Sequence, residues 1–443
     1  MKNKLRFLLP SLVGILTFLT PIRWNGNLTI GISIVVDLVK TMLGSHTLKI
    51  VIAVFVMTSV LTVLATVFKV DWIRRRKKWK DLFDVPFTWL ALRLLGTLFG
   101  LMYLLQVGPE LLISEQIGGA VFIGIAVNVF LIYFSACLVL PLLTDFGFME
   151  FAGTLARPFF RRVFRLPGRS AIDAVTSFVG AASIGLLITI SQYNGGNYTA
   201  RQACTIATNF SVVAIPFALV VATVAGIGHL FIGWYLVVVM ACLLAALITP
   251  RLPPLSGKAQ VYVSGSPDKG PETGRDSQSL ISEAWERAME RAASSPGIRD
   301  YISISLSNMM FFMFSVMAAA MALATMATLI TFHTPIFTWL GYPFISLLEL
   351  AGLADATAAS PALFAGFLDQ YIPAIVAAGI DSNVTSFVLA GLSVCQLIFV
   401  SEVGVIILRS SLPLSIIDLV VIFLLRTVII LPVLIIGAHF IAG

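Results

Sequence analysis

Residues Leu155 to Phe217 read LARPFFRRVFRLPGRSAIDAVTSFVGAASIGLLITISQYNGGNYTARQACTIATNFSVVAIPF. The stretch begins with arginines and aromatic residues, turns at Pro167 and Gly168, and continues as an apolar run that stops at Asn194. Proline and glycine interrupt helices, and this apolar run is too short to cross a bilayer twice. The pattern therefore predicts a helix on the membrane surface followed by a re-entrant hairpin.

The same pattern recurs 185 residues later, from Phe337 to Val403, where Pro343 corresponds to Pro158. Two matching, interrupted apolar units in one chain indicate the repeats of secondary transporters, in which broken helices form the site. Three predicted spans separate the first hairpin from the second surface helix, and an odd number inverts the second copy: Thr199 to Ile227, Leu230 to Ile248 and Ile302 to Ile330. Two ordinary helix pairs that are alike by chance are the alternative.

The composition is that of a membrane protein. Of 443 residues, 58% are hydrophobic and 12% are charged, and the mean hydropathy is +0.97. Few soluble domains carry so little charge, so the chain is expected to cross the bilayer several times. The net charge of +7 does not indicate a nucleic-acid partner, because lysine and arginine cluster beside apolar spans.

The basic clusters also predict orientation. Arg74 to Lys80 and Arg157 to Arg169 are rich in Lys and Arg, whereas Asp300 to Leu408 contain neither. By the positive-inside rule, the two clusters are cytoplasmic and the second hairpin unit faces outward. The N-terminus is then cytoplasmic, and the expected location is a bacterial plasma (inner) membrane.

Four parts follow from this organisation. Residues 1–145 are expected to form a transmembrane scaffold, 146–249 the first repeat, 250–300 a polar linker, and 301–443 the second repeat. Residues Leu28 to Leu43 are either re-entrant or a full span. Within the linker, the PLSGKAQ and SGSPDKGPETGRDSQS stretches read as flexible, but Leu280 to Ala292 have helical apolar spacing, and Glu283 can pair with Arg287.

Polar residues inside the apolar segments are the candidate site. A charge inside the bilayer costs a few kcal/mol, so Glu402, beside Gln396 and Ser401, needs a function or a partner. Arg409 is the structural alternative as its partner. Asp369 and Gln370 lie between Gly366 and Pro373, where a broken helix would expose backbone groups.

The full set of expected substrate-binding residues is Ser183, Gln192, Thr208, Asn209, Ser211, Asp369, Gln370, Ser393, Gln396, Ser401 and Glu402. Asp369 and Glu402 are the expected ion-coupling carboxylates, with Na⁺ or H⁺ as the ion. Asp173 is expected to form a structural ion pair with Arg169, and Arg93 is expected to reach the membrane surface.

No enzyme or metal motif is found. The four cysteines lie singly in apolar runs, and the four histidines are scattered. No glycine-rich phosphate loop and no nucleophile elbow is present. We therefore expect no catalytic residues, no bound metal and no cofactor other than a coupling ion.

The stretches PFFRRVFRLPGRSAIDAVTSFVGAASIG, TARQACTIATNFS, FLDQYIPAI and QLIFVSEVGVIILRSSLPLSIIDL resemble the Gate, or nucleoside-recognition, domain, and most closely its YjiH-like branch. The resemblance covers about Phe148 to Leu419. In the concentrative nucleoside transporters, which share this domain, the resemblance implies a solute bound between hairpin tips and broken helices. It implicates Ser183, Thr208, Asn209, Asp369, Gln396, Ser401 and Glu402. At the first hairpin tip the chain has Ala181, Ala182 and Ser183 where those transporters carry a Gln-Thr-Glu type triplet.

The expected fold is an all-α polytopic membrane protein with two inverted repeats, each having an interfacial helix, a re-entrant hairpin and a discontinuous transmembrane helix. The expected function is ion-coupled secondary transport of a small polar, nucleoside-like solute by alternating access. A signalling or assembly module that keeps the fold, or a channel, is the alternative. The expected partners are the lipid bilayer and the solute, and homo-oligomerisation stays open.

Overall fold

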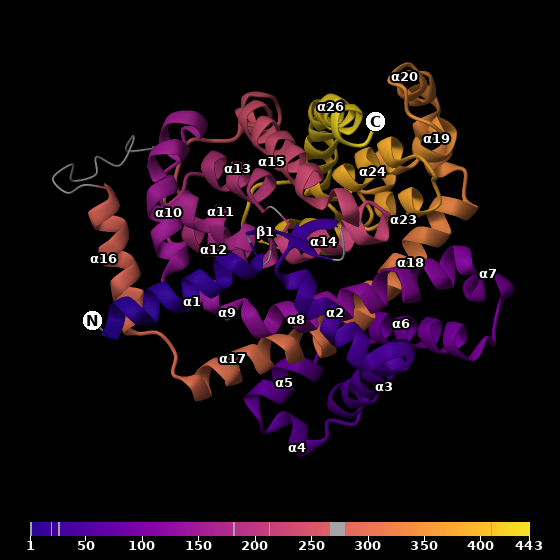
Figure 1. Ribbon diagram of the computed structural model, residues 1–443, viewed down its shortest axis with the longest axis horizontal. Coiled ribbons are helices and arrows are strands. Elements are labelled where there is room, and N and C mark those ends of the chain that lie inside the picture. The colour runs from indigo at the N-terminus through magenta and orange to yellow at the C-terminus, as the bar shows by residue number, and fades with distance from the viewer. Residues whose placement is uncertain are drawn as a thin grey trace.

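The computed structural model describes residues 2–18, 20–24, 27–179, 182–211, 213–265, 280–408 and 410–443, and within them the chain is almost entirely helical (Figure 1). The N-terminal part comprises α1 (Lys2–Phe18), β1 (Pro21–Trp24), β2 (Asn27–Ile30), α2 (Ile32–Leu43), η1 (Gly44–His46), α3 (Thr47–Thr66), α4 (Asp71–Arg74), α5 (Lys77–Phe83), α6 (Phe87–Leu105), α7 (Glu110–Ile113), η2 (Glu115–Val127), α8 (Asn128–Val139) and α9 (Pro141–Thr144).

The next elements form the first hairpin unit: α10 (Phe148–Phe159), η3 (Phe160–Phe164), α11 (Ser170–Val179), α12 (Ala182–Asn194), α13 (Ala200–Asn209), α14 (Ile215–Val224), η4 (Gly228–Leu230) and α15 (Phe231–Ile248). The connection contains η5 (Thr249–Arg251), η6 (Leu255–Gly257), α16 (Leu280–Ala293), α17 (Ile298–Phe311), η7 (Phe312–Met317) and α18 (Ala318–His333).

The last elements form the second hairpin unit: α19 (Ile336–Gly341), η8 (Tyr342–Phe344), α20 (Ile345–Leu350), α21 (Ala356–Ala359), α22 (Ala362–Ala365), α23 (Ile372–Ala378), α24 (Asn383–Cys395), η9 (Val400–Gly404), α25 (Val405–Leu408) and α26 (Ile416–Ile441). In each unit, short helices are followed by a broken helix and then by a long apolar helix.

Six helical stretches in the described residues are long and apolar enough to cross a membrane: Ile32–Thr66, Phe87–Leu105, Glu110–Val139, Gly228–Arg251, Ile298–His333 and Ile416–Ile441. These confirm a helical, multi-pass membrane protein. The segment predicted as re-entrant or spanning becomes α2, which joins α3 in one helical stretch through η1. The predicted scaffold begins with α1, a helix of 17 residues.

The all-α prediction misses one small feature, the antiparallel pair of β1 and β2, in which Ile22 pairs with Thr29. At its turn end, the Trp24 indole donates a hydrogen bond to Asp37 in α2 over 2.6 Å. That bond gives the acidic residue of α2 a partner, since an unpaired carboxylate in an apolar helix is costly.

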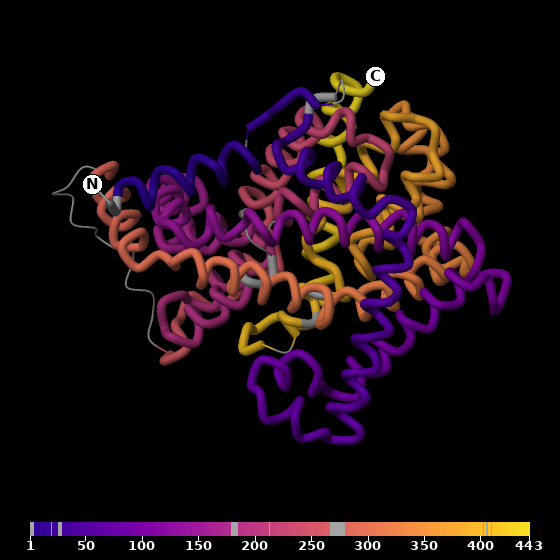
Figure 2. Tube along the Cα trace, turned by 60° about the horizontal axis from the view of Figure 1, so that its bottom comes forward, coloured from indigo at the N-terminus to yellow at the C-terminus, as the bar shows by residue number. Residues whose placement is uncertain are grey.

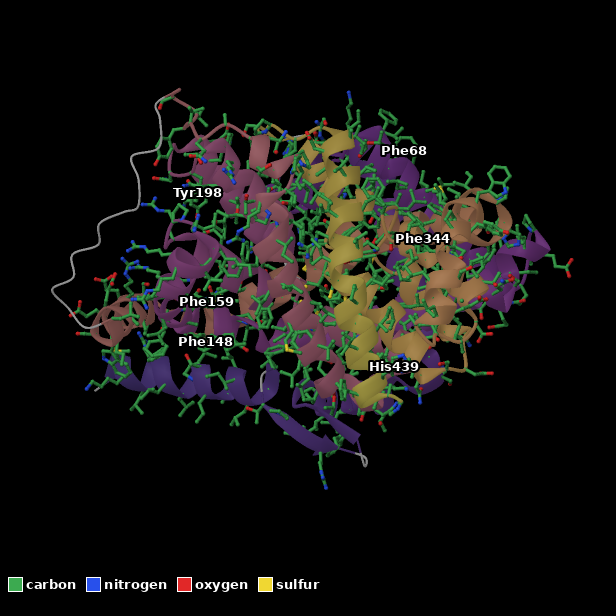
Figure 3. The ribbon with its side chains drawn as sticks, turned by 90° about the horizontal axis from the view of Figure 1, so that it is seen from above. Phe68, Phe148, Phe159, Tyr198, Phe344 and His439 are labelled. Carbon is green, nitrogen blue, oxygen red and sulfur yellow. The ribbon has the colours of Figure 1, made fainter. Side chains whose placement is uncertain are left out.

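Helix α26, the last helix of the second unit, lies between the first unit and the other helices of the second. Figure 3 shows it upright, with Phe159 and Tyr198 of the first unit on one side and Phe344 of the second on the other. The tube in Figure 2, turned by a different angle, gives the same arrangement. Helix α26 packs against α15 of the first unit and against α24 of the second. A residue near the middle of α26 can therefore contact both units.

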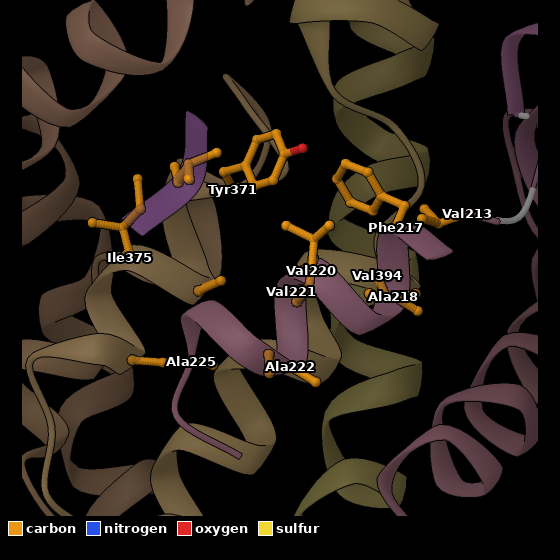
Figure 4. Close-up of a cluster of buried hydrophobic side chains, with 14 of the residues drawn as sticks. Val213, Phe217, Ala218, Val220, Val221, Ala222, Ala225, Tyr371, Ile375 and Val394 are labelled. Atoms are coloured by element: carbon orange, nitrogen blue, oxygen red, sulfur yellow. The ribbon is translucent and has the colours of Figure 1, made fainter. Parts of the chain in front are cut away.

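An apolar cluster fills the space between α14, α23 and α24 (Figure 4). Every residue of α14 named in that cluster is small or branched except Phe217, whose ring lies 4.9 Å from that of Tyr371 in the second unit. Since α14 is buried from Ile215 to Ala222, this part of the helix is covered by protein on all sides rather than by lipid on one.

The prediction that Arg93 reaches the membrane surface is wrong. Arg93 in α6 is 2% exposed. Its guanidinium donates to Thr62 Oγ1 at 2.8 Å, to the Leu82 carbonyl at 3.0 Å and to the Ser315 carbonyl at 3.0 Å. Arg93 is buried rather than exposed because its side chain lies where three helical segments meet and supply acceptors.

The flexible linker prediction is wrong for its beginning. Leu255 is fully buried, and the amides of Ala200 and Arg201 donate to the Val261 and Ala259 carbonyls, each at 3.0 Å. Lys258 Nζ also lies 2.9 Å from Asp418 Oδ2. The segment therefore packs on the bundle, because its backbone and its lysine find partners there.

The predicted amphipathic helix is confirmed as α16. Its buried residues are Ala284, Ala288 and Ala292, and the predicted Glu283–Arg287 pair forms at 3.0 Å. The helix packs against α1 and α10, so it rests on the bundle.

Candidate functional site

Each hairpin unit contains a helix that is broken at a polar residue. Helix α13 ends at Asn209, and α14 begins at Ile215 with Pro216 in its first turn. Proline is tolerated there because the first amides of a helix have no helical acceptor. Helix α24 ends at Cys395, and the chain then passes through Leu397, whose φ is +60°. Each break leaves carbonyl groups at a helix C-terminus without helical donors.

Arg426 of α26 donates hydrogen bonds to groups at both helix breaks. Its side chain is fully buried. In the second unit it donates to the Cys395 carbonyl at 2.7 and 3.2 Å and to the Gln396 carbonyl at 3.1 Å. In the first unit it donates to Asn209 Oδ1 at 2.7 Å and to the Thr208 carbonyl at 3.4 Å. We call this arrangement the Arg426 junction.

The electrostatics of the Arg426 junction follow from helix ends. The C-terminus of a helix carries a partial negative charge, so a cation there is favourable. Two such ends face one guanidinium, whose planar fork can serve several acceptors at once. This compensates the burial of a charge that is not matched by a carboxylate in any ion pair of the described residues.

Asn209 is held on several sides. Its Oδ1 also accepts from Thr249 Oγ1 at 2.6 Å, and its Nδ2 donates to the Thr205 carbonyl and to Thr208 Oγ1, each at 3.1 Å. Thr208 Oγ1 in turn donates to the Cys204 carbonyl at 2.8 Å. Both the oxygen and the nitrogen of the Asn209 side-chain amide are hydrogen-bonded, so the oxygen that faces Arg426 is held in place.

The side-chain amide of Gln396 has a hydrogen-bonded nitrogen and an unpaired oxygen. Its Nε2 donates to the Leu363 carbonyl and to Thr427 Oγ1, each at 2.9 Å. Its Oε1 is buried without a hydrogen-bond partner, next to Gly366, where a side chain would collide with it. Buried acceptors are nearly always paired, so this oxygen is an exception among the described residues.

Asp369 lies where the second hairpin meets the second broken helix. The amides of Val400 and Ser401 donate to the Phe367 and Leu368 carbonyls, at 2.8 and 3.2 Å. Asp369 is 5% exposed. Its Oδ1 accepts from the Tyr371 amide at 2.9 Å, and the Ser401 hydroxyl is a further donor to it. The predicted residues Asp369 and Ser401 are therefore neighbours.

The structure leaves the other predicted residues in different surroundings. Gln370 Oε1 and Ser393 Oγ are buried without partners in the described residues. Ser211 donates to the Ala207 carbonyl at 2.9 Å within its own helical turn. Gln192 accepts from Asn197 at 2.8 Å near the exposed end of α12. The side chains of Ser183 and Glu402, and Arg409 as a whole, lie outside the described residues.

Asp173 has hydroxyl partners inside the first hairpin. Its Oδ2 accepts from Tyr198 at 2.9 Å and from Thr189 at 3.1 Å. These bonds tie α11 and α12 to the start of α13. Arg169 also acts on the carboxylate through its charge, so the predicted partner contributes together with the hydroxyls.

Sequence reasoning missed Arg426, although a signal was present. It is a single basic residue near the middle of a 26-residue apolar helix, and an ionisable residue inside a span is a functional candidate by default. The positive-inside rule considers charges at span ends, so it does not register this one. No group of three or more His, Cys, Asp or Glu residues that could hold a metal occurs in the described part of the chain.

Six long apolar stretches and two broken helices joined by a buried arginine define a helical, multi-pass membrane protein. A family model described as Gate, nucleoside recognition, matches residues 126–228, which confirms the predicted Gate resemblance. BpOF4_10220, an uncharacterized protein of Alkalihalophilus pseudofirmus, is 41% identical over 437 residues, covering 99% of this chain and 94% of that protein. The chain belongs to the same family as BpOF4_10220. Its assignment to the YjiH-like branch stays a prediction.

A solved structure of CNTnw, in an inward-facing substrate-bound state, is a distant likeness. It is 11% identical with a TM-score of 0.42, and the match covers 99% of both chains.

Proposed function

We propose that this protein is a secondary transporter that carries a small polar, nucleoside-like solute across a bacterial inner membrane by alternating access, coupled to Na⁺ or H⁺. The observation that carries the proposal is the Arg426 junction. Polar groups at two broken helices converge on a buried charge, which is the arrangement expected at a transporter site. The proposal also includes an inverted relation of the two hairpin units and a cytoplasmic N-terminus.

The unpaired atoms support a polar solute. Gln396 Oε1, Gln370 Oε1 and Ser393 Oγ are buried without partners in the described residues. Leaving a buried polar group unpaired costs about 1–3 kcal/mol. A solute with amide or hydroxyl donors would recover part of that free energy. In this proposal Thr208, Asn209 and Ser211 shape the same region from the first unit, and Ser183 and Gln192 belong to its hairpin.

The carboxylates support ion coupling. Asp369 is buried beside the second break, and Glu402 is two positions from the end of η9. A buried carboxylate is costly when charged, so it favours binding a proton or a Na⁺ ion. Arg426 already occupies the carbonyls of both helix ends, and the coupling ion is therefore assigned to Asp369 and Glu402.

The experiment is uptake into proteoliposomes of purified full-length protein. A panel of radiolabelled nucleosides, amino acids and dipeptides is tested with an inward Na⁺ gradient, an inward H⁺ gradient, or neither. Uptake of at least one solute that requires a gradient is expected. Gln396→Ala should abolish it, and Gln192→Ala, at the exposed end of α12, should weaken it far less.

A non-transport module is the second candidate, and one observation favours it. The contact between α14 and the second unit is packed with apolar side chains (Figure 4), as in a static core. If no solute of the panel is taken up or binds, and Gln396→Ala changes only thermal stability, the transport proposal is abandoned for this one.

A further inference from the structure

A cavity of about 250 Å³ lies where η3 ends, α13 begins and α15 passes into η5. Three arginines line it: Arg165, Arg201 and Arg251. None of the residues that line the cavity is acidic. Three like charges around one small space repel each other, and an anion placed among them would remove the repulsion.

The arginines retain donors for a ligand. Arg201 Nη2 donates to the Pro250 carbonyl at 3.1 Å, and Arg251 Nη1 donates to the Leu247 carbonyl. A guanidinium has five N–H donors, so each keeps several after these bonds. No ion pair among the described residues involves any of the three.

The first backbone amides of α13 already have acceptors, so a ligand in the cavity would bind to side chains. Helix α13 begins with a capping box of Thr199 and Gln202. Its first two amides donate to the Val261 and Ala259 carbonyls. The helix N-terminus therefore adds a favourable partial charge for an anion, but no free amide.

The docked beginning of the predicted linker completes the cavity. Gln260 lies between those two carbonyl residues and lines the cavity together with Pro250. Phe164, Leu166 and Ala246 add apolar lining. A binding place of this kind combines three cationic groups with polar amides and a short apolar wall.

We propose that this three-arginine cavity binds a phosphate group, either of an anionic lipid headgroup or of a free phosphate. Arginine forks bind phosphate oxygens in pairs, which makes phosphate a better match than a carboxylate or a halide. Drug-sized ligands occupy pockets of about 300–1,000 Å³, so the cavity suits a headgroup rather than a larger solute. Basic pockets beside transmembrane helices are a known form of headgroup site. This inference does not depend on the transport proposal.

The test is isothermal titration of the purified full chain in a neutral detergent. The probes are dioctanoyl phosphatidylglycerol, dioctanoyl phosphatidylcholine and inorganic phosphate, at matched ionic strength. The variant Arg165→Gln/Arg251→Gln removes two cavity charges that are solvent-exposed. Arg75→Gln/Arg76→Gln, in the exposed basic run after α4, is the matched control.

We expect at least tenfold weaker binding of the phosphate probe in the cavity variant and less than twofold change in the control. Binding of phosphatidylglycerol without inorganic phosphate assigns a lipid headgroup, and binding of both assigns phosphate itself. The proposal is overturned if wild-type protein binds neither probe, or if the cavity variant and the control weaken binding equally. It is also overturned if phosphatidylcholine binds as tightly as phosphatidylglycerol and the cavity variant changes neither. Arg165→Gln alone repeats the test if the double variant does not fold.

Discussion

The Arg426 guanidinium donates to Asn209 Oδ1 over 2.7 Å, although the two residues are 217 positions apart in the chain. The same guanidinium also donates to the Cys395 carbonyl at 2.7 Å. One side chain of α26 thus connects the broken helices of both hairpin units. Any movement of one unit against the other must keep, stretch or exchange these bonds.

The first prediction concerns this connection. Arg426→Met removes the Arg426 donor from the Cys395 carbonyl at one helix end and from the Thr208 carbonyl at the other, at about 1–3 kcal/mol for each orphaned group. Removing a buried charge raises the free energy of unfolding and offsets part of this loss. The carbonyls at the two helix ends, however, remain buried. We expect the free energy of unfolding to fall by about 2–4 kcal/mol, measured by thermal and denaturant unfolding in detergent.

Arg426→Lys separates charge from geometry. Lysine keeps the positive charge but cannot serve both helix ends with a planar fork. It should therefore be less stable than wild type and more stable than Arg426→Met. Equal stability of wild type and Arg426→Met would show that the connection contributes nothing.

The second prediction concerns Arg93. Arg93→Met leaves the Leu82 and Ser315 carbonyls without their donor, and a loss of about 2 kcal/mol is expected for two neutral acceptors. Its network shares no partner with that of Arg426 in the described residues. The two losses should therefore add within about 0.5 kcal/mol in the double variant. A strongly non-additive double variant would indicate one shared network.

The third prediction concerns orientation. Asp355 and Lys78 are both exposed, and the four native cysteines are buried, so background labelling should be low. Single cysteines at these two positions should react with a membrane-impermeant maleimide from opposite sides of the membrane, because lysine and arginine mark the cytoplasmic side. Labelling of both from the same side would contradict the inverted relation of the two hairpin units.

The fourth prediction concerns ion coupling. Asp369→Asn keeps the acceptor for the Tyr371 amide and removes the charge, so the protein should still fold. Uptake should lose its dependence on the Na⁺ or H⁺ gradient, and Glu402→Gln should have the same effect.

The alternative for Glu402 is a structural pair with Arg409. In that case Glu402→Gln and Arg409→Gln should lower the unfolding temperature equally, without changing gradient dependence. That result would leave Asp369 as the coupling carboxylate.

The fifth prediction concerns pH and the docking of α16. Burial raises the pKa of Glu283, but the hydrogen bond from Arg157 and the charges of Arg157 and Arg287 outweigh it, so the pKa lies below its ordinary value of 4.5. Arg157 Nη1 lies 2.6 Å from Glu283 Oε1. The carboxylate therefore stabilises docking above pH 4.5, and this contribution is lost as the pH falls through the lowered pKa.

Hydrogen exchange of the α16 amides tests this linkage. At pH 7, Glu283→Gln should exchange faster than wild type, by the roughly two- to fivefold that a partly exposed pair of up to about 1 kcal/mol implies. At about pH 3 the two proteins should exchange alike. Glu286→Gln, on the exposed face of α16, is the matched control and should exchange like wild type at both values.

Local pattern predicted much of the fold. Apolar periodicity located the long spans and α16, and Pro and Gly located the ends of the hairpin helices. Pro216 in the first turn of α14 is a sequence signal for the break after Asn209. These features depend on residues that are close together in the chain, so they can be predicted from the sequence.

The surroundings of the charged residues could not be predicted in the same way. Arg93 and Arg426 each have acceptors that lie on other helices, up to 222 positions away. A buried charge requires partners, but the sequence does not say which ones. The docking of Lys258 on Asp418, 160 positions away, is the same case, and a polar composition alone suggested a tether.

The sequence by itself determined that this chain is a helical membrane protein with two similar interrupted units, because hydropathy and helix breakers act over one or two turns. Only the tertiary structure decided that α26 of the second unit also packs against the first and that its arginine joins the broken helices of both. The physical reason is that carbonyls freed by a helix break can be satisfied by any donor the fold brings near, and that choice is made by packing between distant segments.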